Sequence, residues 1–438
     1  MPLPLYLLAL AVFAMGTSEF MLAGLVPDIA ASLDVSIGAA GLLTSAFAVG
    51  MTLGAPVMAA LTRRWPARAT LLTFVLVFAL THVVGALATS FSLLLVTRAI
   101  AAVANAGFLA VALSTAARLV PGDRKGRALA VLLSGTTLAT IAGVPGGALL
   151  GTLLDWRATF WAISLLCLPA AYGIVKGIPA HAGPTTPEPS GGIPLRTELA
   201  QLALPRPALV MLLSALVNAA TFATFTFLAP IVTDAAGLGE LWVSLVLMLF
   251  GAGSLCGVTL AGRLSDQRPG RVIGIGVPML LLGWVAFATL AAQPVALLLL
   301  AFVQGSLSFA VGSTLIARVL YEAAGAPTMA GSYATAALNL GAAGGPAVAA
   351  ASLDTGGGHV APVWVSFSLV ALAAAIALPF RRGLAPAAPT GSTGPRTDRG
   401  PARPADRRPG RRAGTPPLHP PSPSPPRPGR DRRSVRRG

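Results

Sequence analysis

The chain has 438 residues, of which 55% are hydrophobic and only 11% charged, and its mean hydropathy is +0.76. This composition excludes a soluble globular protein, in which roughly a quarter of the residues are charged. The net charge of +16 is unevenly divided, since residues 1–380 hold 16 basic and 12 acidic side chains (+4) and residues 381–438 hold 15 and 3 (+12). A nucleic-acid-binding function would rest on residues 381–438 alone, and no nucleic-acid partner is expected.

Apolar runs of 18 or more residues recur along the chain and predict transmembrane helices that span a lipid bilayer. The first run has no Lys or Arg before it and is long enough to span, which favours a retained helix over a cleaved signal peptide. Twelve spans are expected, near 5–27, 40–61, 70–88, 91–117, 128–153, 158–178, 208–232, 242–262, 272–291, 294–317, 329–352 and 361–380. The predicted fold is an all-α membrane protein with two six-helix halves.

Basic residues mark one side of the membrane. They gather in the loops after the even-numbered spans, whereas the opposite loops carry carboxylates and one cation, Arg157. Cytoplasmic loops are enriched in Lys and Arg, so both termini are expected in the cytoplasm of a multi-pass plasma-membrane protein. The predicted segments are an amino-terminal half at 1–178, a cytoplasmic linker at 179–207, a carboxy-terminal half at 208–380 and a disordered basic Pro- and Arg-rich tail at 381–438.

Glycines in the fifth span indicate a close helix–helix contact. Gly135, Gly143, Gly147 and Gly151 are spaced by four or eight residues, so they fall on one helical face. Such a face lets a second helix approach closely, as in small-xxx-small packing. Pro145 removes one helical hydrogen bond and predicts a bend. From the spacing alone, ordinary close packing explains the glycines equally well.

Two ionisable residues within the spans are candidates for proton coupling. Glu19 lies about two-thirds of the way outward in the first span, and Arg98 lies in the outer half of the fourth. Charged groups inside a membrane usually face a cavity or a partner, because burying them in lipid is costly. One interpretation is a proton-binding carboxylate beside a cation that tunes it; the other is a structural Glu–Arg pair that holds the half together.

Polar and aromatic residues from several spans are candidates to line a substrate cavity. The set comprises Asn105, Asn218, Phe222, Phe225, Gln304 and Asn339, and further polar groups in the spans are His82 and Tyr333. Each polar group alone suits an interhelical hydrogen bond as well, and the aromatic side chains suit lipid contact. No phosphate-binding loop and no clustered Cys and His ligands occur, so neither a cofactor nor a metal is expected.

The fifth-span motif resembles the glycine- and proline-rich helix of proton-coupled drug exporters in the major facilitator superfamily. Within that superfamily, four stretches are similar to the chloramphenicol resistance exporters of actinomycetes: Met15–Ile29, Leu43–Gly50, Asn105–Leu113 and Trp156–Trp161. The resemblance implies two halves that rock about a central site, a small-molecule drug substrate, protons as coupling ions and a monomer. Chloramphenicol is neutral and amphiphilic, so an apolar cavity with scattered amides would suit it.

The segment Gly262–Arg271 resembles the cytoplasmic gating motif of the same superfamily. Asp266, Arg263 and Arg268 occupy the motif's charged positions. The corresponding amino-terminal segment, Leu61–Arg68, lacks the acidic residue, which departs from the usual pattern.

Three functions are compared. The first is proton-coupled antiport of chloramphenicol that confers antibiotic resistance, and the second is export of sugars, other small metabolites or a different drug. The third is an intramembrane enzyme or receptor. An enzyme needs paired catalytic groups at one depth, and the chain offers none besides Glu19 and Arg98; a receptor usually carries a folded output domain. A transporter that is not an enzyme is therefore expected.

Removing the tail is predicted to leave transport intact. Its composition cannot bury enough apolar surface to offset the entropy of ordering, although its charge could hold anionic lipid head groups. A chain truncated after Arg382 should reach the membrane and still confer resistance, as measured by membrane fractionation and by growth on the drug. Loss of both properties would contradict a dispensable tail.

Overall fold

Long apolar segments become helices here because lipid offers the backbone no hydrogen-bond partners, so each segment must satisfy its own N–H and C=O groups. The computed structural model describes residues 2–62, 65–121, 125–179, 204–265, 269–322, 330–354 and 358–380. All of them belong to one compact unit, Met1–Pro386. The predicted linker, except at its two ends, and the predicted tail lie outside the described residues.

Each half of the chain contributes six membrane-spanning segments. The amino-terminal half contains α1 (Leu3–Phe20), α2 (Leu22–Ser32), α3 (Ile37–Leu61), α4 (Ala67–Ala86), α5 (Phe91–Arg118), α6 (Lys125–Leu138), α7 (Val144–Leu153) and α8 (Trp156–Gly177). The carboxy-terminal half contains α10 (Pro205–Thr226), α11 (Leu228–Pro230), α12 (Leu241–Ser265), α13 (Pro269–Leu290), α14 (Pro294–Glu322), α15 (Ala330–Asp354) and α16 (Ala361–Phe380). Within the described residues, twelve helices are long and apolar enough to cross a bilayer, which confirms the predicted spans.

The first span of each half is interrupted, although both were expected to be continuous. In the first span, α1 ends at Phe20 and α2 begins at Leu22. In the seventh span, α10 ends at Thr226 and α11 follows. Pro230 explains the second break, because proline has no N–H to donate to the carbonyl four residues earlier, that of Thr226. The break at Met21 has no comparable signal in the sequence.

Pro145 is accommodated by a change of helix type. A π-helical turn, Ala139–Gly143, separates α6 from α7, and Pro145 lies in the first turn of α7. A proline ring in an ordinary helix clashes with the carbonyl four residues earlier. The wider π turn, a feature often found at functional sites, directly precedes the proline and relieves this conflict.

The fifth-span glycines lie against the first span. A Cβ atom added at Gly135 would meet the backbone of α1 at the carbonyl of Ala9 and, 2.9 Å away, the nitrogen of Phe13. At Gly143 it would collide with the side chain of Thr17. The neighbour is therefore backbone at one position and a side chain at the other, and the absence of a Cβ allows both approaches.

The next two glycines extend this contact toward α2 and α8. A Cβ atom at Gly151 would meet Leu25 of α2. At Gly147 it would lie 3.0 Å from Cγ2 of Thr159 in α8 and 3.6 Å from Cβ of Met21. The fifth span thus fits between the first span and α8, and its glycine face contacts more than one helix.

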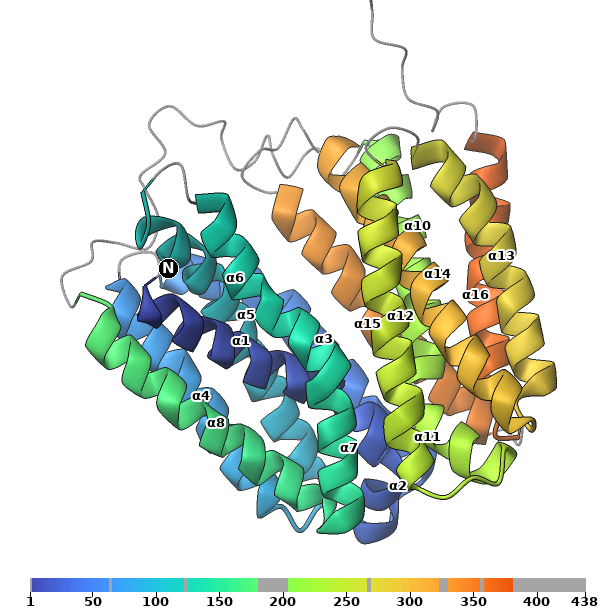
Figure 1. Ribbon diagram of the computed structural model, residues 1–438, viewed down its shortest axis with the longest axis horizontal. Coiled ribbons are helices and arrows are strands. Elements are labelled where there is room, and N and C mark those ends of the chain that lie inside the picture. Colours follow the sequence, from blue (N-terminus) through green and yellow to red (C-terminus); the bar gives the residue numbers. More distant parts are fainter. Residues whose placement is uncertain are drawn as a thin grey trace, which may run out of the picture. The chain divides into compact units, whose positions relative to one another are not determined.

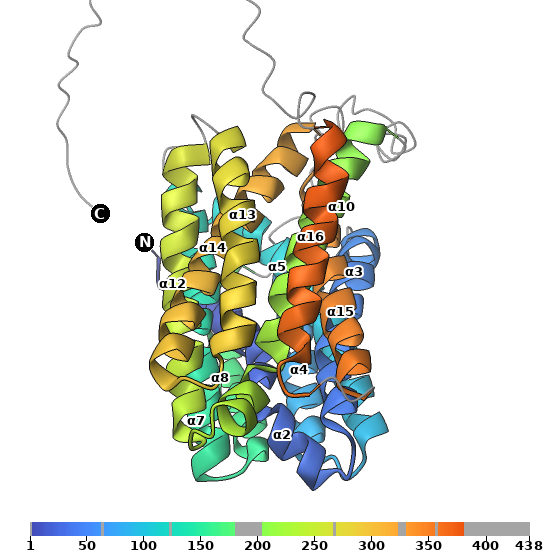
Figure 2. The same cartoon turned by 90° about the vertical axis from the view of Figure 1, so that its right-hand side faces the viewer.

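The two halves meet where α3 packs against α15, where α7 and the π turn before it pack against α12, and where α2 contacts α10, α11 and α12. The hydroxyl of Ser45 in α3 donates a hydrogen bond to the carbonyl of Ala343 in α15 at 2.7 Å. The ribbons of the two halves lie close together at the end that holds α2, α7 and α11, and they diverge toward the end where α8 stops and α10 starts (Figure 1). Seen from the side of α13 and α16, α2 lies at the same end as α7 (Figure 2).

Candidate functional site

A cavity of about 230 Å³ lies where the last turn of α1 faces the carboxy-terminal half. Its lining residues are Glu19, Phe20, Asn218, Thr221, Phe222, Val258, Ser308, Phe309, Gly312, Ser313, Ile316, Leu338, Asn339 and Ala342. All except the first two come from α10, α12, α14 and α15. The amino-terminal half therefore contributes a carboxylate and an aromatic ring, and the other half contributes the rest of the wall.

Glu19 and its neighbour Ser18 point in different directions from α1, and only Glu19 reaches this cavity. Successive residues of an α-helix point about 100° apart. Ser18 is fully buried in the amino-terminal half, whereas the half-buried Glu19 lines the cavity. Among the cavity's lining residues Glu19 supplies the one carboxylate. A group that can bind a proton is thus placed directly beside the space that a substrate could occupy.

One face of α14 forms much of the opposite wall. Ser308, Gly312 and Ile316 follow one another at intervals of four residues, and Phe309 and Ser313 lie beside them on the same face. Sequence analysis missed these residues. The four-residue spacing of small and polar side chains within an apolar span is the signal that could have identified them.

The cavity's amides and hydroxyls differ in how fully they are hydrogen-bonded. Asn218 donates to the carbonyl of Leu338 at 2.7 Å, which joins α10 to α15, and Asn339 donates to the carbonyl of Thr335 at 3.0 Å. The Oγ atom of Ser308 is buried and has no hydrogen-bond partner among the described residues. An unpaired polar atom in an apolar setting is costly, so Ser308 is suited to bind a polar group of a substrate.

Five phenylalanines join the two halves beside the cavity. Phe20 lies 5.9 Å from Phe222 and 6.4 Å from Phe225, measured between ring centroids. The cluster continues from Phe225 to Phe250 at 5.1 Å and from there to Phe309 at 6.4 Å. Phe225 lies one residue before α10 ends, so the cluster extends from the cavity toward α11. Edge-to-face and tilted ring pairs of this kind add to the stability of the contact between the halves.

Arg98 lies close to Glu19 in the chain's fold but is held by other groups. Its Nη1 atom donates to the hydroxyl of Ser18 at 2.7 Å, and Nη2 donates to the Ser18 carbonyl at 2.8 Å. The guanidinium lies over the ring of Phe47, 4.4 Å from its centroid. Within the described residues, no ion pair of 4.0 Å or less joins Arg98 to Glu19. A direct Glu–Arg pair, the structural alternative, is therefore not formed in this conformation.

His82 completes a buried polar network around Ser18. The Nε2 atom of His82 lies 2.6 Å from the Ser18 hydroxyl, and Nδ1 lies 2.7 Å from the carbonyl of Phe78. Ser18, His82 and Arg98 come from α1, α4 and α5, and each is at most 1% exposed. The network is adjacent to the cavity through the peptide bond between Ser18 and Glu19.

The remaining predicted site residues lie elsewhere. Phe225 lines a small pocket next to the main cavity. Gln304 is buried and donates to the carbonyl of Leu280 at 3.3 Å, so it joins α14 to α13. Asn105 is buried in α5 and is not among the cavity's lining residues.

The predicted gating motif cannot be placed. Asp266 and Arg268 lie outside the described residues, as does the side chain of Arg263. No group of three or more metal-ligating side chains occurs in the part of the chain that the structure describes.

Comparison with known proteins supports a transporter. The chain matches the family model described as Major Facilitator Superfamily over residues 8–337. It is 67% identical over 393 residues to a chloramphenicol resistance protein of Streptomyces lividans, a match that covers 90% of this chain and 100% of the relative. It is 32% identical over 356 residues to the inner membrane transport protein YdhP of Escherichia coli K12, covering 81% of this chain and 90% of the relative.

Solved structures share the fold at low identity. The nucleoside transporter NupG superimposes with a TM-score of 0.70 at 14% identity, covering 87% of this chain and 99% of the other. A bacterial homologue of the human lysosomal transporter Spinster, described as inward-facing and unoccupied, gives 0.67 at 17% identity, covering 87% and 96%. These matches confirm the predicted fold of two six-helix halves. The chain is a multi-pass membrane transporter, not an enzyme, and it belongs to the Major Facilitator Superfamily.

Proposed function

We propose that the chain exports chloramphenicol across the plasma membrane in exchange for protons and so confers resistance to the drug. The observation that carries this proposal is the position of Glu19, a carboxylate that lines a largely apolar cavity between the two halves. The 67% identity to a chloramphenicol resistance protein over that relative's whole length supports the substrate. Growth on graded chloramphenicol, with and without the gene, tests the substrate independently of the coupling ion.

The coupling step uses the division of the site between the halves. Glu19 belongs to the amino-terminal half, whereas most of the wall belongs to the other half, so rocking of one half against the other changes the surroundings of the carboxylate. Facing outward, Glu19 takes up a proton; facing inward, it releases the proton to the cytoplasm as the drug is loaded. Antiport follows because the proton and the drug favour different states of the protein.

The orientation follows from the distribution of basic residues. We place both termini and the diverging ends of the two halves in the cytoplasm, and the end that holds α2, α7 and α11 outside. The cavity then faces inward, ready to receive drug from the cytoplasm, and the phenylalanine cluster lies on its outer side. The transporter acts as a monomer, because each chain holds a complete pair of halves.

The cavity chemistry suits a neutral amphiphile. Aromatic side chains can pack against an aromatic ring, while Asn339, Asn218 and Ser308 can bind polar groups. A sugar or another small metabolite would use the same amides but would bury less apolar surface against the aromatic wall. Competition by sugars in a chloramphenicol transport assay separates these two substrates.

Replacing Ser308 is expected to weaken chloramphenicol binding without changing proton coupling. The hydroxyl has no partner among the described residues, so Ser308→Ala removes a substrate hydrogen bond and breaks none within the protein. A lost neutral hydrogen bond is worth ~0.5–1.5 kcal/mol, which corresponds to an increase of about two- to tenfold in the KM for the drug. Initial rates of uptake into inverted vesicles at several drug concentrations give this value.

Ser313→Ala is the matched control. The Ser313 hydroxyl lines the same cavity but already donates to the carbonyl of Ala310 at 3.2 Å. Ser313→Ala should therefore raise the KM for the drug less than Ser308→Ala does. Equal KM values for Ser308→Ala and the unaltered protein would show that this side chain does not contact the drug.

A further inference from the structure

The buried network of Ser18, His82 and Arg98 has a role that the cavity itself does not explain. It joins three helices of the amino-terminal half, α1, α4 and α5, and all three side chains are almost inaccessible. It ends one residue before the carboxylate that lines the cavity.

The donors and acceptors of the network can be assigned by elimination. A backbone carbonyl only accepts, so Nδ1 of His82 carries the hydrogen that points to Phe78. The Ser18 hydroxyl accepts from Nη1 of Arg98, which leaves its own hydrogen free for Nε2 of His82. With a neutral imidazole, Nε2 of His82 accepts from the Ser18 hydroxyl. The assignment fixes the direction of the hydroxyl, with its lone pairs toward Arg98.

The guanidinium depends on Ser18 for its position. Its two described hydrogen bonds both go to this residue, one to the side chain and one to the carbonyl. Nε is buried and has no partner among the described residues, and Phe47 supports the guanidinium only by its ring face. Ser18 lies in the last turn of α1, where carbonyls lack partners further along the helix and are free to accept. A change in the Ser18 hydroxyl would therefore loosen Arg98.

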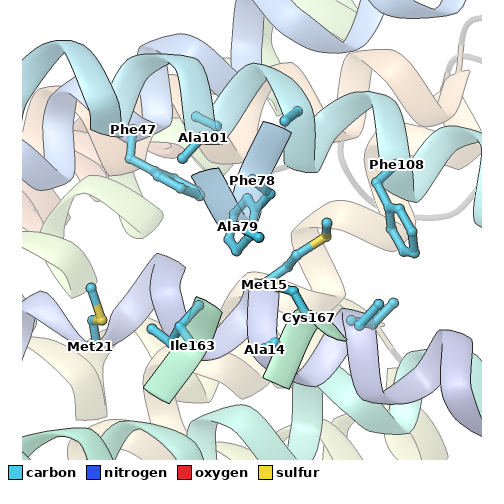
Figure 3. Close-up of a cluster of buried hydrophobic side chains, with 14 of the residues drawn as sticks. Ala14, Met15, Met21, Phe47, Phe78, Ala79, Ala101, Phe108, Ile163 and Cys167 are labelled. Carbon is cyan, nitrogen blue, oxygen red and sulfur yellow. The ribbon is translucent and has the colours of Figure 1, made fainter. Parts of the chain in front are cut away.

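The surroundings of His82 are apolar. Its ring lies 4.3 Å from that of Phe78 and 5.6 Å from that of Phe160. Figure 3 shows the neighbouring core, in which Phe47 and Phe78 gather with Met15. The helices packed against α4 include α5 and α8, and the charged group that acts on His82 is Arg98 of α5; Glu19 follows Ser18 in α1. In such a setting, the interaction between Arg98 and Glu19 is screened only weakly.

We propose that His82 is a positioning residue for proton coupling, which acts through Ser18 to hold the guanidinium of Arg98 beside the end of α1. The proposal rests on the proposed role of Glu19 as proton carrier. A nearby cation favours the charged form of a carboxylate, so the position of Arg98 sets the pH at which Glu19 releases its proton. If Arg98 is less firmly held, Glu19 keeps its proton up to a higher pH.

The test measures pH-gradient-driven chloramphenicol uptake into inverted vesicles over a series of pH values on the cytoplasmic side of the protein. His82→Leu removes the acceptor and should move the midpoint of the pH profile upward by roughly one unit, a tenfold change in proton affinity. The KM for the drug should change less than twofold, because His82 does not line the cavity. His82→Gln has a side-chain carbonyl that can accept from Ser18, so the midpoint of its pH profile should lie close to that of the unaltered protein.

Two further variants keep the test decisive if His82→Leu is poorly folded. Ser18→Ala breaks the same link from the other side and should shift the midpoint in the same direction, and the double variant should shift it no further. Thr70→Val is the control, because Thr70 is a buried polar residue of α4 whose hydroxyl donates to the carbonyl of Pro66, the residue that caps the same helix, at 3.0 Å.

The outcomes separate this inference from the proposed function. If the unaltered protein shows no dependence on the pH gradient, the role of Glu19 fails. The positioning role of His82 is tested when the unaltered protein does depend on the gradient. It is wrong if His82→Leu and Ser18→Ala keep the normal midpoint, or if their uptake rates fall equally at every pH.

Discussion

Replacing Glu19 by glutamine should abolish proton-driven efflux while leaving drug binding nearly intact. Glutamine has the shape and hydrogen-bonding capacity of a protonated glutamate but cannot release a proton. Because Glu19 supplies the one carboxylate of the cavity's described lining, no second carboxylate of that lining can take over its role. In inverted vesicles under an imposed pH gradient, we expect uptake of chloramphenicol by Glu19→Gln to fall to background.

The same preparation provides the controls. Exchange of labelled for unlabelled chloramphenicol at equal pH on both sides needs no net proton movement and should persist in Glu19→Gln. Glu240→Gln makes the identical change at an exposed position between α11 and α12 and should leave gradient-driven uptake unchanged. Gradient-dependent uptake at normal rates by Glu19→Gln would show that another group carries the proton.

A leucine at Gly135 or Gly143 should strongly impair transport. At Gly135 the new side chain would occupy the space of the α1 backbone at Ala9 and Phe13, and at Gly143 that of Thr17. Overpacking of this kind lowers the free energy of unfolding by ~1–3 kcal/mol. It also separates the fifth span from the first, which carries Glu19. We expect lower thermal stability in detergent and little efflux, although the protein should still reach the membrane.

Gly146→Leu tests whether the effect is specific to the packed face. Gly146 lies in the same membrane span, but a Cβ atom there has no neighbour within 4 Å. Its leucine variant should keep both stability and transport. Equal damage from all three leucines would mean that the fifth span tolerates no bulk anywhere, and normal transport by the variants at Gly135 and Gly143 would contradict the packing described above.

The spans could be predicted because hydrophobic length alone defines a membrane helix. The fourth span, expected at 91–117, is observed at Phe91–Arg118. Ser90 precedes it as a helix cap, because its hydroxyl accepts a hydrogen bond from the N–H of Leu93. Glu19 and Arg98 could be identified because charged residues are rare inside apolar runs. Patterns that depend on one helix at a time are thus visible in the sequence.

Features that need two or more helices were not predictable. The sequence carries no signal for the break at Met21, or for the contact of Gln304 with the carbonyl of Leu280 in another helix. Ser18 could not be identified because serine is common in such helices; its importance comes from Arg98 and His82, which are 80 and 64 positions away. Which face of α14 lines the cavity likewise depends on how that helix is rotated in the bundle.

If Glu19 couples the movement of drug to the movement of protons, as we propose, the coupling must act in both directions. The most direct measurement uses proteoliposomes that contain a pH-sensitive dye and the purified protein, with equal pH on both sides and a gradient of chloramphenicol. We expect drug that leaves the liposomes to drive protons in, and Glu19→Gln to abolish this proton flux. Drug movement through the unaltered protein without any proton flux would contradict this coupling.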